Sequence, residues 1–239
     1  MHSDRYIYLL ITFMSVVVSV ALSLTFAKLD PQYQSNVELD RIKNILQIAG
    51  YETDNMDREK IDTVYKTFNE IVIKDDGVEI DSVKYNELSI GNELPSGESV
   101  YELDGYRVFP LFEDTKNNIL IIPVSGKGLW GTLYGYFAIN NNGSVAGITF
   151  YKHKETPGLG GEVDAKWFQE QFNDTKYIFN NEKLVSLQVM KPGINTDKER
   201  YSVNGISGAT ITSNGVQNFL KADLENYEHY IRSYLGGNR

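Results

Sequence analysis

The chain has 239 residues, a formal net charge of −9 and no cysteine, and its length suits one large domain or two small ones. The acidic balance disfavours nucleic acid as a partner, because neutralising phosphates requires a basic surface. The lack of cysteine excludes disulfides, thiolate metal sites, iron–sulfur ligation by this chain and a cysteine nucleophile, and three histidines give little basis for a metal site.

An uncharged run of 22 residues, 6–27, stands near the start of the chain. At about 1.5 Å per helical residue it is long enough to cross a hydrocarbon core of about 30 Å. We therefore predict a single N-terminal transmembrane helix, with residues 1–28 forming a short head and the anchor. A cleaved signal peptide that ends at Ala27 is the alternative.

The charges around this run indicate its orientation only weakly. Arg5 precedes the run, but Asp4 offsets it. A very short head followed by a long acidic domain still favours a cytoplasmic N-terminus with the bulk of the chain outside. Asp4, Arg5 and Lys28 sum to +1, so the residues after Lys28 carry −10. Anionic lipid head groups repel such a domain, and we expect it to stand off the membrane or to dock on protein.

Residues 29–98 are interpreted as a helical and irregular connecting region. Apolar spacing predicts a helix over 31–50, with Pro31 in its first turn and Gly50 at its end. A second helix is predicted over 57–73, with Asp57 as its N-cap. Residues 74–95 are polar, with short apolar groups typical of irregular strands.

The remaining residues, 99–239, combine strands and helices. Strands are predicted at 99–110, 118–124, 133–140 and 144–151, the last two joined by the hairpin signal Asn141-Asn142-Gly143. A glycine-rich turn at 155–161 precedes a helix at 165–172, a strand at 184–190 and a closing helix from Asn214 to about Leu235. Without regular βαβ alternation, this order indicates an α+β fold with a mixed or antiparallel sheet and flanking helices. One face of the closing helix is apolar: Val216, Phe219, Leu220, Leu224, Tyr227 and Ile231.

A hydroxyl-rich, glycine-containing turn over 204–213 leads into the closing helix. Asn214 with Gln217 fits a capping box, and Ser213 is an equally good cap. Free N–H groups and the helix dipole favour an anion there, above all a phosphate. Gly205 and Gly208 let the backbone turn tightly beside a bulky group. Taken alone, these residues favour an ordinary helix cap, because such turns are common.

Residues 207–210, Ser-Gly-Ala-Thr, resemble the flavinylation motif of the covalent FMN-binding domain family. In that family an acidic residue and two further residues precede Ser/Thr-Gly-Ala and the hydroxyl residue that receives the flavin. The resemblance implies that FMN is joined through its phosphate to Thr210 by a phosphoester. Binding residues are then expected around it: Asn204, Ser207, Gly208, Ala209 and Thr212. Asn204 stands where the family has an acidic residue, which leaves open how efficiently the flavin is attached.

Two further segments, 126–136 and 153–160, resemble the C subunit of the sodium-translocating NADH:quinone oxidoreductases. The G subunit of the Rnf electron-transport complex shares the flavinylation motif and the single anchor, but generally lacks the Leu-Trp-Gly form of the first segment. Trp130 can stack on a flavin ring. The turn offers further groups to the ring edge and face: Glu155, Thr156, Leu159 and Gly160.

The resemblance implies a covalent flavoprotein subunit that relays electrons from NADH toward quinone in a sodium-pumping complex, with residues 99–239 as the FMN-binding domain. It places the bulk of the chain on the periplasmic side of a bacterial inner membrane. The flavin carries the redox chemistry, so no catalytic or metal-ligating residue is assigned. Other membrane and flavin or iron–sulfur subunits and a flavin transferase are implied as partners. The alternatives are the Rnf G subunit and a non-redox anchored module that binds an extracytoplasmic ligand.

Overall fold

The computed structural model describes residues 4–173, 176–180, 183–194 and 199–236, and it divides the chain into two compact units, Met1–Lys43 and Asn44–Arg239. The first unit consists of most of helix α1 (Asp4–Ile48). By length and composition this helix can cross a membrane, in agreement with the predicted anchor. The domain boundaries expected at residues 28 and 98 remain predictions.

Helix α1 continues through Pro31, so the separate helix predicted to start there is wrong. A proline inside a helix removes one hydrogen bond. No glycine or other break flanks this proline, and the helix continues on both sides of it. The predicted end is confirmed, because Gly50 adopts the left-handed conformation at φ +89° and Tyr51 N–H returns to the Leu46 carbonyl.

Asp57 caps helix α2 (Arg58–Tyr65), since its Oδ1 accepts a hydrogen bond of 2.9 Å from Lys60 N–H. The predicted extension of this helix to residue 73 is wrong. Strand β1 (Phe68–Ile73) follows and pairs antiparallel with β4. The run of β-branched residues at 71–73 favours a strand, and the partner strand supplies the hydrogen bonds.

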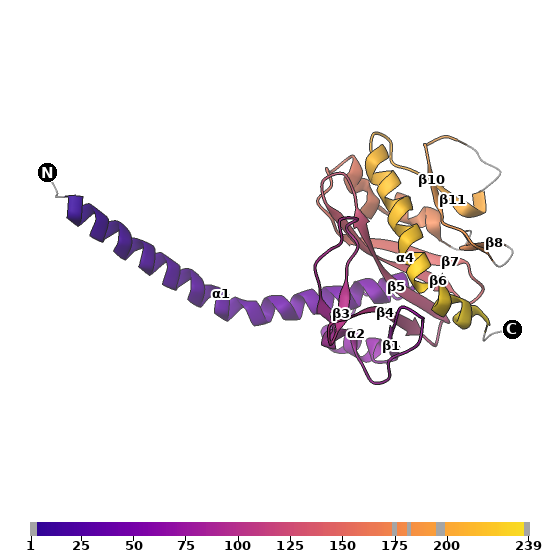
Figure 1. Cartoon of the computed structure of the whole chain (residues 1–239), viewed down its shortest axis with the longest axis horizontal. Helices are drawn as coiled ribbons and strands as arrows, with labels where there is room; N and C mark the ends of the chain where they lie inside the picture. Colours follow the sequence, from indigo (N-terminus) through magenta and orange to yellow (C-terminus); the bar gives the residue numbers. More distant parts are fainter. Residues whose placement is uncertain (1–3, 174–175, 181–182, 195–198, 237–239) are drawn as a thin grey trace. The chain divides into compact units, whose positions relative to one another are not determined.

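The second unit is built on a seven-stranded antiparallel sheet in the order β2-β3-β4-β5-β6-β7, with β1 also on β4 (Figure 1). The single strand predicted at 99–110 is wrong, because positive φ angles at Asp104 and Gly105 fold it into a hairpin. The hairpin predicted around Gly143 is confirmed. A short 3₁₀ helix, η1 (Tyr85–Glu87), precedes β2. The other strands are β2 (Ser89–Ile90), β3 (Tyr101–Leu103), β4 (Tyr106–Asp114), β5 (Ile119–Lys127), β6 (Thr132–Asn140) and β7 (Val145–Lys152).

Short elements connect the sheet to the last helix. The helix predicted at 165–172 is only α3 (Lys166–Gln169) between two 3₁₀ turns, η2 (Gly160–Asp164) and η3 (Glu170–Phe172). The strand predicted at 184–190 is divided into β9 (Lys183–Leu184), which pairs with β8 (Phe179–Asn180), and β10 (Gln188–Met190). Strand β10 runs parallel to β11 (Ser202–Asn204), which follows the 3₁₀ turn η4 (Glu199–Tyr201).

Helix α4 (Thr210–Gly236) covers one face of the sheet, along β5 (Figure 1). All six side chains of its predicted apolar face are buried. They pack into the main core with side chains of β5, including Leu120, Ile122 and Val124.

The contact between α4 and β5 is closer than ordinary side chains allow. A Cβ atom on Gly126 would lie 2.2 Å from Phe219 Cβ, and one on Gly215 would lie 2.4 Å from the Lys127 carbonyl oxygen. Nearby, Asp223 Oδ2 accepts a hydrogen bond of 2.9 Å from Ser125 N–H. Burial raises the pKa of this carboxyl well above its usual range, because the charged form loses its hydration. Strand and helix are thus joined by glycine contacts and by a buried polar bond.

We predict that Gly126→Ala destabilises the chain by about 1–3 kcal/mol, because the added methyl group overpacks the contact with Phe219. Gly236→Ala is the matched control, since nothing lies within 4 Å of the added atom. Urea unfolding of the full chain in detergent, followed by tryptophan fluorescence, measures both. Equal midpoints for the two variants would contradict the close approach of β5 and α4.

Candidate functional site

Three segments singled out in the sequence meet at the carboxylate of Glu155, which is 5% exposed. Its Oε1 accepts a hydrogen bond of 2.8 Å from Trp130 N–H, in the loop between β5 and β6. Its Oε2 accepts one of 2.5 Å from the Thr212 hydroxyl, in the first turn of α4. Residues far apart in sequence are therefore joined by one buried side chain.

Two glycines make room for this carboxylate. A Cβ atom on Gly128 would lie 2.7 Å from Glu155 Oε1, and one on Gly160 would lie 2.4 Å from Oε2. The glycine spacing of 126–131 matches the G-x-G-x-x-G of dinucleotide-binding loops. Here, however, the run joins two antiparallel strands, whereas a dinucleotide loop leads from a strand into a helix. Gly128 and Gly160 serve close packing around Glu155.

The turn before α4 is held by backbone hydrogen bonds to side chains. Asn204 is fixed through its main chain, because its N–H donates to Gln171 Oε1 at 2.9 Å and its carbonyl accepts from Gln171 Nε2 at 3.1 Å. Ile206 N–H donates to Ser213 Oγ at 3.0 Å. Gly208 adopts φ +76°, which favours glycine, and the chain then enters α4.

Helix α4 begins at Thr210, four residues before the predicted start. The predicted capping roles of Ser213, Asn214 and Gln217 are wrong, because Ser213 N–H already bonds the Ala209 carbonyl within the helix. Gln217 Oε1 accepts instead from Val189 N–H at 2.9 Å. The side chains that resemble caps thus hold the preceding turn and strand β10.

Burial divides the hydroxyl groups of this segment into two sets. Thr212 and Ser213 are buried and hydrogen-bonded, whereas Ser207 and Thr210 are exposed. Thr210 is the first residue of a 27-residue helix, whose first N–H groups have no acceptor within the helix. The partial positive charge of that end favours an anion beside Thr210.

Large apolar side chains are exposed on the same three segments. Trp130 is 66% exposed and Leu159 45%, and Leu159 Cδ2 would lie 3.1 Å from a Cβ on Gly208. Leu129 and Ile211 are also exposed, and neither was identified from the sequence. Ile211 lies outside the apolar face of α4, and this departure from the helical pattern could have indicated from the sequence that its side chain is exposed. An exposed hydroxyl beside apolar side chains fits a phosphorylated aromatic ligand such as FMN.

The turn at 155–161 is ordered by its neighbours. His153 Nδ1 accepts a hydrogen bond of 3.2 Å from Glu155 N–H, and His153 Nε2 lies 3.2 Å from Asp164 Oδ2. The Thr156 carbonyl accepts hydrogen bonds from the N–H groups of Leu159 and Gly161, and Thr156 is exposed to solvent. This turn presents Thr156 and Leu159 to solvent and Glu155 to the interior.

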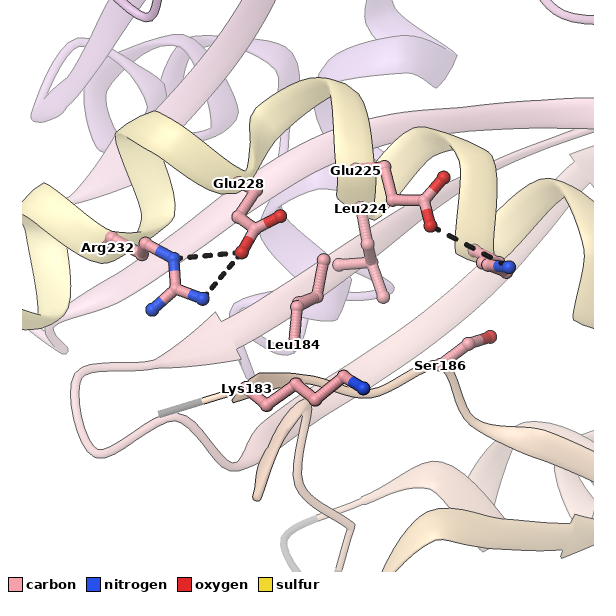
Figure 2. A pocket seen from close by; sticks show the side chains of 8 residues that line it. Lys183, Leu184, Ser186, Leu224, Glu225, Glu228 and Arg232 are labelled. Atoms are coloured by element: carbon pink, nitrogen blue, oxygen red, sulfur yellow. Dashed lines mark hydrogen bonds and ion pairs between the residues drawn. The ribbon is translucent and has the colours of Figure 1, made fainter. Parts of the chain in front are cut away.

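A separate hollow of about 240 Å³ lies farther along α4 (Figure 2). The two cations that α4 contributes are paired with carboxylates of the same helix, Arg232 with Glu228 at 2.6 Å and Lys221 with Glu225 at 3.8 Å. At about 1.5 Å per residue, Lys221 is about 16 Å along the helix from Thr210. The hollow contains none of the predicted flavin-binding residues and is distinct from the candidate site.

Comparisons with known proteins identify relatives over most of the chain. Residues 128–225 match the family described as "FMN-binding domain". The chain is 33% identical to the C subunit of the Na(+)-translocating NADH-quinone reductase of Pseudomonas aeruginosa, over 86% of this chain and 85% of that protein. It is 32% identical to the protein of the same name from Pasteurella multocida, over 89% and 86%. A crystal structure of the C subunit from Parabacteroides distasonis is similar, with a TM-score of 0.65 and 26% identity, over 85% of this chain and 96% of that chain.

We predict that Ser213→Ala destabilises the chain by about 1–3 kcal/mol, because the buried Ile206 N–H loses its acceptor. The control is Ser207→Ala, which removes an exposed hydroxyl of the same turn and is expected to change stability by less than about 0.5 kcal/mol. Urea unfolding in detergent compares the two variants. A Ser213→Ala variant as stable as the control would show that the serine does not hold the turn.

Proposed function

Because the chain belongs to the C-subunit family of the Na(+)-translocating NADH-quinone reductases, we propose that it carries FMN as a covalent group on Thr210. In this proposal it is an electron-relay subunit between the NADH-oxidising and quinone-reducing parts of such a complex. The observation that carries the proposal is the exposed Thr210 hydroxyl at the N-terminus of α4, beside exposed apolar side chains.

Burial supports Thr210 as the attachment residue over its neighbours. Thr212 and Ser213 are committed to internal hydrogen bonds and are closed to a transferase. In the proposed attachment the Thr210 hydroxyl attacks the FMN phosphorus of FAD, forms the phosphoester and loses its proton as AMP leaves. The N–H groups of the first turn of α4 would hold the attached phosphate, which would keep a negative charge.

The surrounding residues would bind and orient the group. Trp130, Leu159 and Ile211 offer apolar surface to an isoalloxazine ring, and Thr156 and Gly160 belong to the adjacent turn. Ala209 is buried and Gly208 provides the left-handed turn, so both act through the backbone. Bound flavin supplies the reversible gain and loss of electrons, and this chain positions it and limits its contact with water.

The composition supports a role inside a larger assembly. The chain has no cysteine for an iron–sulfur centre, and we assign it no NADH site. Other subunits must therefore supply and accept the electrons, and a flavin transferase is needed for maturation. Helix α1 would anchor the chain in a bacterial inner membrane, with the second unit on the periplasmic side.

We predict that Thr210→Ala abolishes covalent flavin on coexpression with a flavin transferase, whereas Thr210→Ser retains it because a hydroxyl remains. Ser207→Ala is the control, because it removes the other exposed hydroxyl of the motif. Flavin fluorescence on a denaturing gel and intact mass measure the outcome. Persistent fluorescence of Thr210→Ala, or its loss in Ser207→Ala alone, would contradict attachment at Thr210.

The lack of native cysteine allows a direct test of orientation. We predict that an impermeant maleimide labels Asp54→Cys in cells with a permeabilised outer membrane. Asp4→Cys is expected to react only after the inner membrane is disrupted, although both positions are exposed in the fold. The reverse pattern would contradict a periplasmic second unit, and a mature chain lacking residue 4 would contradict an uncleaved anchor.

A further inference from the structure

We propose that Glu155 is a positioning residue, whose carboxylate fixes the Trp130 loop and the first turn of α4 in register with each other before flavin is attached. This inference rests on the proposed function, because it concerns the same site. It replaces direct contact between Glu155 and the flavin ring, the role expected from the sequence, with an action through Trp130 and Thr210.

Both carboxylate oxygens of Glu155 are already occupied. Oε1 accepts from Trp130 N–H at 2.8 Å, Oε2 accepts from Thr212 Oγ1 at 2.5 Å, and the residue is 5% exposed. A side chain so buried presents little surface to a ligand. Hydrogen bonds to an ionised acceptor are short and strong, so the two bonds hold their partners firmly.

Each bond holds a different functional residue. The bond to Trp130 is made by its backbone, so it fixes the loop and leaves the indole exposed. The same loop is closed by Gly128 N–H to the Gly131 carbonyl at 2.8 Å. The bond to Thr212 restrains the helical turn that begins at Thr210. Glu155 therefore bonds both to the Trp130 loop and to the first turn of α4.

The position of the carboxylate is itself determined by its surroundings. His153 Nδ1 accepts the Glu155 N–H, which orients the start of the turn. Gly128 and Gly160 lie so close to the two oxygens that a methyl group on either would collide with them. The carboxylate therefore has little freedom to move, and it can hold the Trp130 loop and the first turn of α4 in fixed positions.

This geometry predicts how substitutions rank. Glu155→Gln keeps the length of the side chain, and the new amide can accept from Trp130 N–H through Oε1 and donate to Thr212 Oγ1 through Nε2. Glu155→Ala loses both bonds. Thr212→Val has a similar shape but lacks the hydroxyl, so it removes only the bond to the helix. If Glu155 is a positioning residue, Glu155→Gln keeps the order of the Trp130 loop and the rate of flavin attachment, whereas Glu155→Ala loses both.

The first measurement needs no flavin. In the full chain in detergent, Trp167→Phe leaves Trp130 as the one tryptophan. We expect the fluorescence anisotropy of Trp130 to decay faster in Glu155→Ala, and to match the parent in Glu155→Gln and Thr212→Val. Unchanged anisotropy in Glu155→Ala, or equal loss in all three variants, would overturn the proposal.

The second measurement is the rate of flavin attachment by a purified transferase with FAD. We expect Glu155→Ala and Thr212→Val to lower kcat by about tenfold to 100-fold with little change in KM, because the Thr210 hydroxyl is displaced. Glu155→Gln should stay within a few-fold of the parent. A Glu155→Gln rate as low as that of Glu155→Ala would overturn positioning, because charge would then be the requirement.

The two measurements separate this inference from the proposed function. Peptide mass spectrometry of the parent chain locates the flavin, and a site other than Thr210 would contradict the proposed function while leaving the anisotropy result valid. Flavin on Thr210 with unchanged anisotropy in Glu155→Ala would contradict only the inference. If Glu155→Ala fails to fold, a normal rate in Thr212→Val overturns the proposal, and a low rate with unchanged anisotropy supports it.

Discussion

The close contact between helix α4 and strand β5 is the constraint on which the candidate site depends. Because Gly126 and Gly215 have no side chains, the two elements lie closer together than other residues would allow. The hydrogen bond from Ser125 N–H to Asp223 fixes their alignment. Strand β5 continues directly into the Trp130 loop, and α4 begins with Thr210. Packing in the core therefore determines how these two residues of the candidate site are placed.

Burial then assigns roles that residue type alone does not. The segment 207–213 offers four hydroxyl groups, and the fold uses Thr212 and Ser213 internally while it exposes Ser207 and Thr210. Glu155 shows the same division. A carboxylate beside a glycine-rich turn suggests a ligand contact, but its two oxygens serve the protein's own loop and helix. Polar residues near a binding site thus act either on the ligand or on the scaffold.

Much of the fold follows from local patterns, and several of the errors arise from contacts that lie outside the predicted element. The anchor, the Asp57 cap, the Gly143 hairpin and the apolar face of α4 are encoded by neighbours in sequence, and they were predicted. The helix expected at 68–73 is strand β1, because β4 supplies its partner. The start of α4 was misplaced because Ser213 bonds to Ile206 N–H in the preceding turn and Gln217 to the backbone of β10, instead of capping the helix. Contacts outside the predicted element decided both cases.

The site shows the same limit of sequence reasoning. The glycines and the Ser-Gly-Ala-Thr motif singled out three segments, but only the fold shows that these segments meet at Glu155. Ile211 was missed because it departs from the apolar stripe of α4, and that departure is informative. Ile211 is an apolar side chain that the core does not use, 58% exposed beside Thr210, and its exposure costs solvation free energy unless something covers it. Trp130 and Leu159 are exposed on the neighbouring segments, and the aromatic group that we propose on Thr210 would cover this apolar surface of an acidic domain.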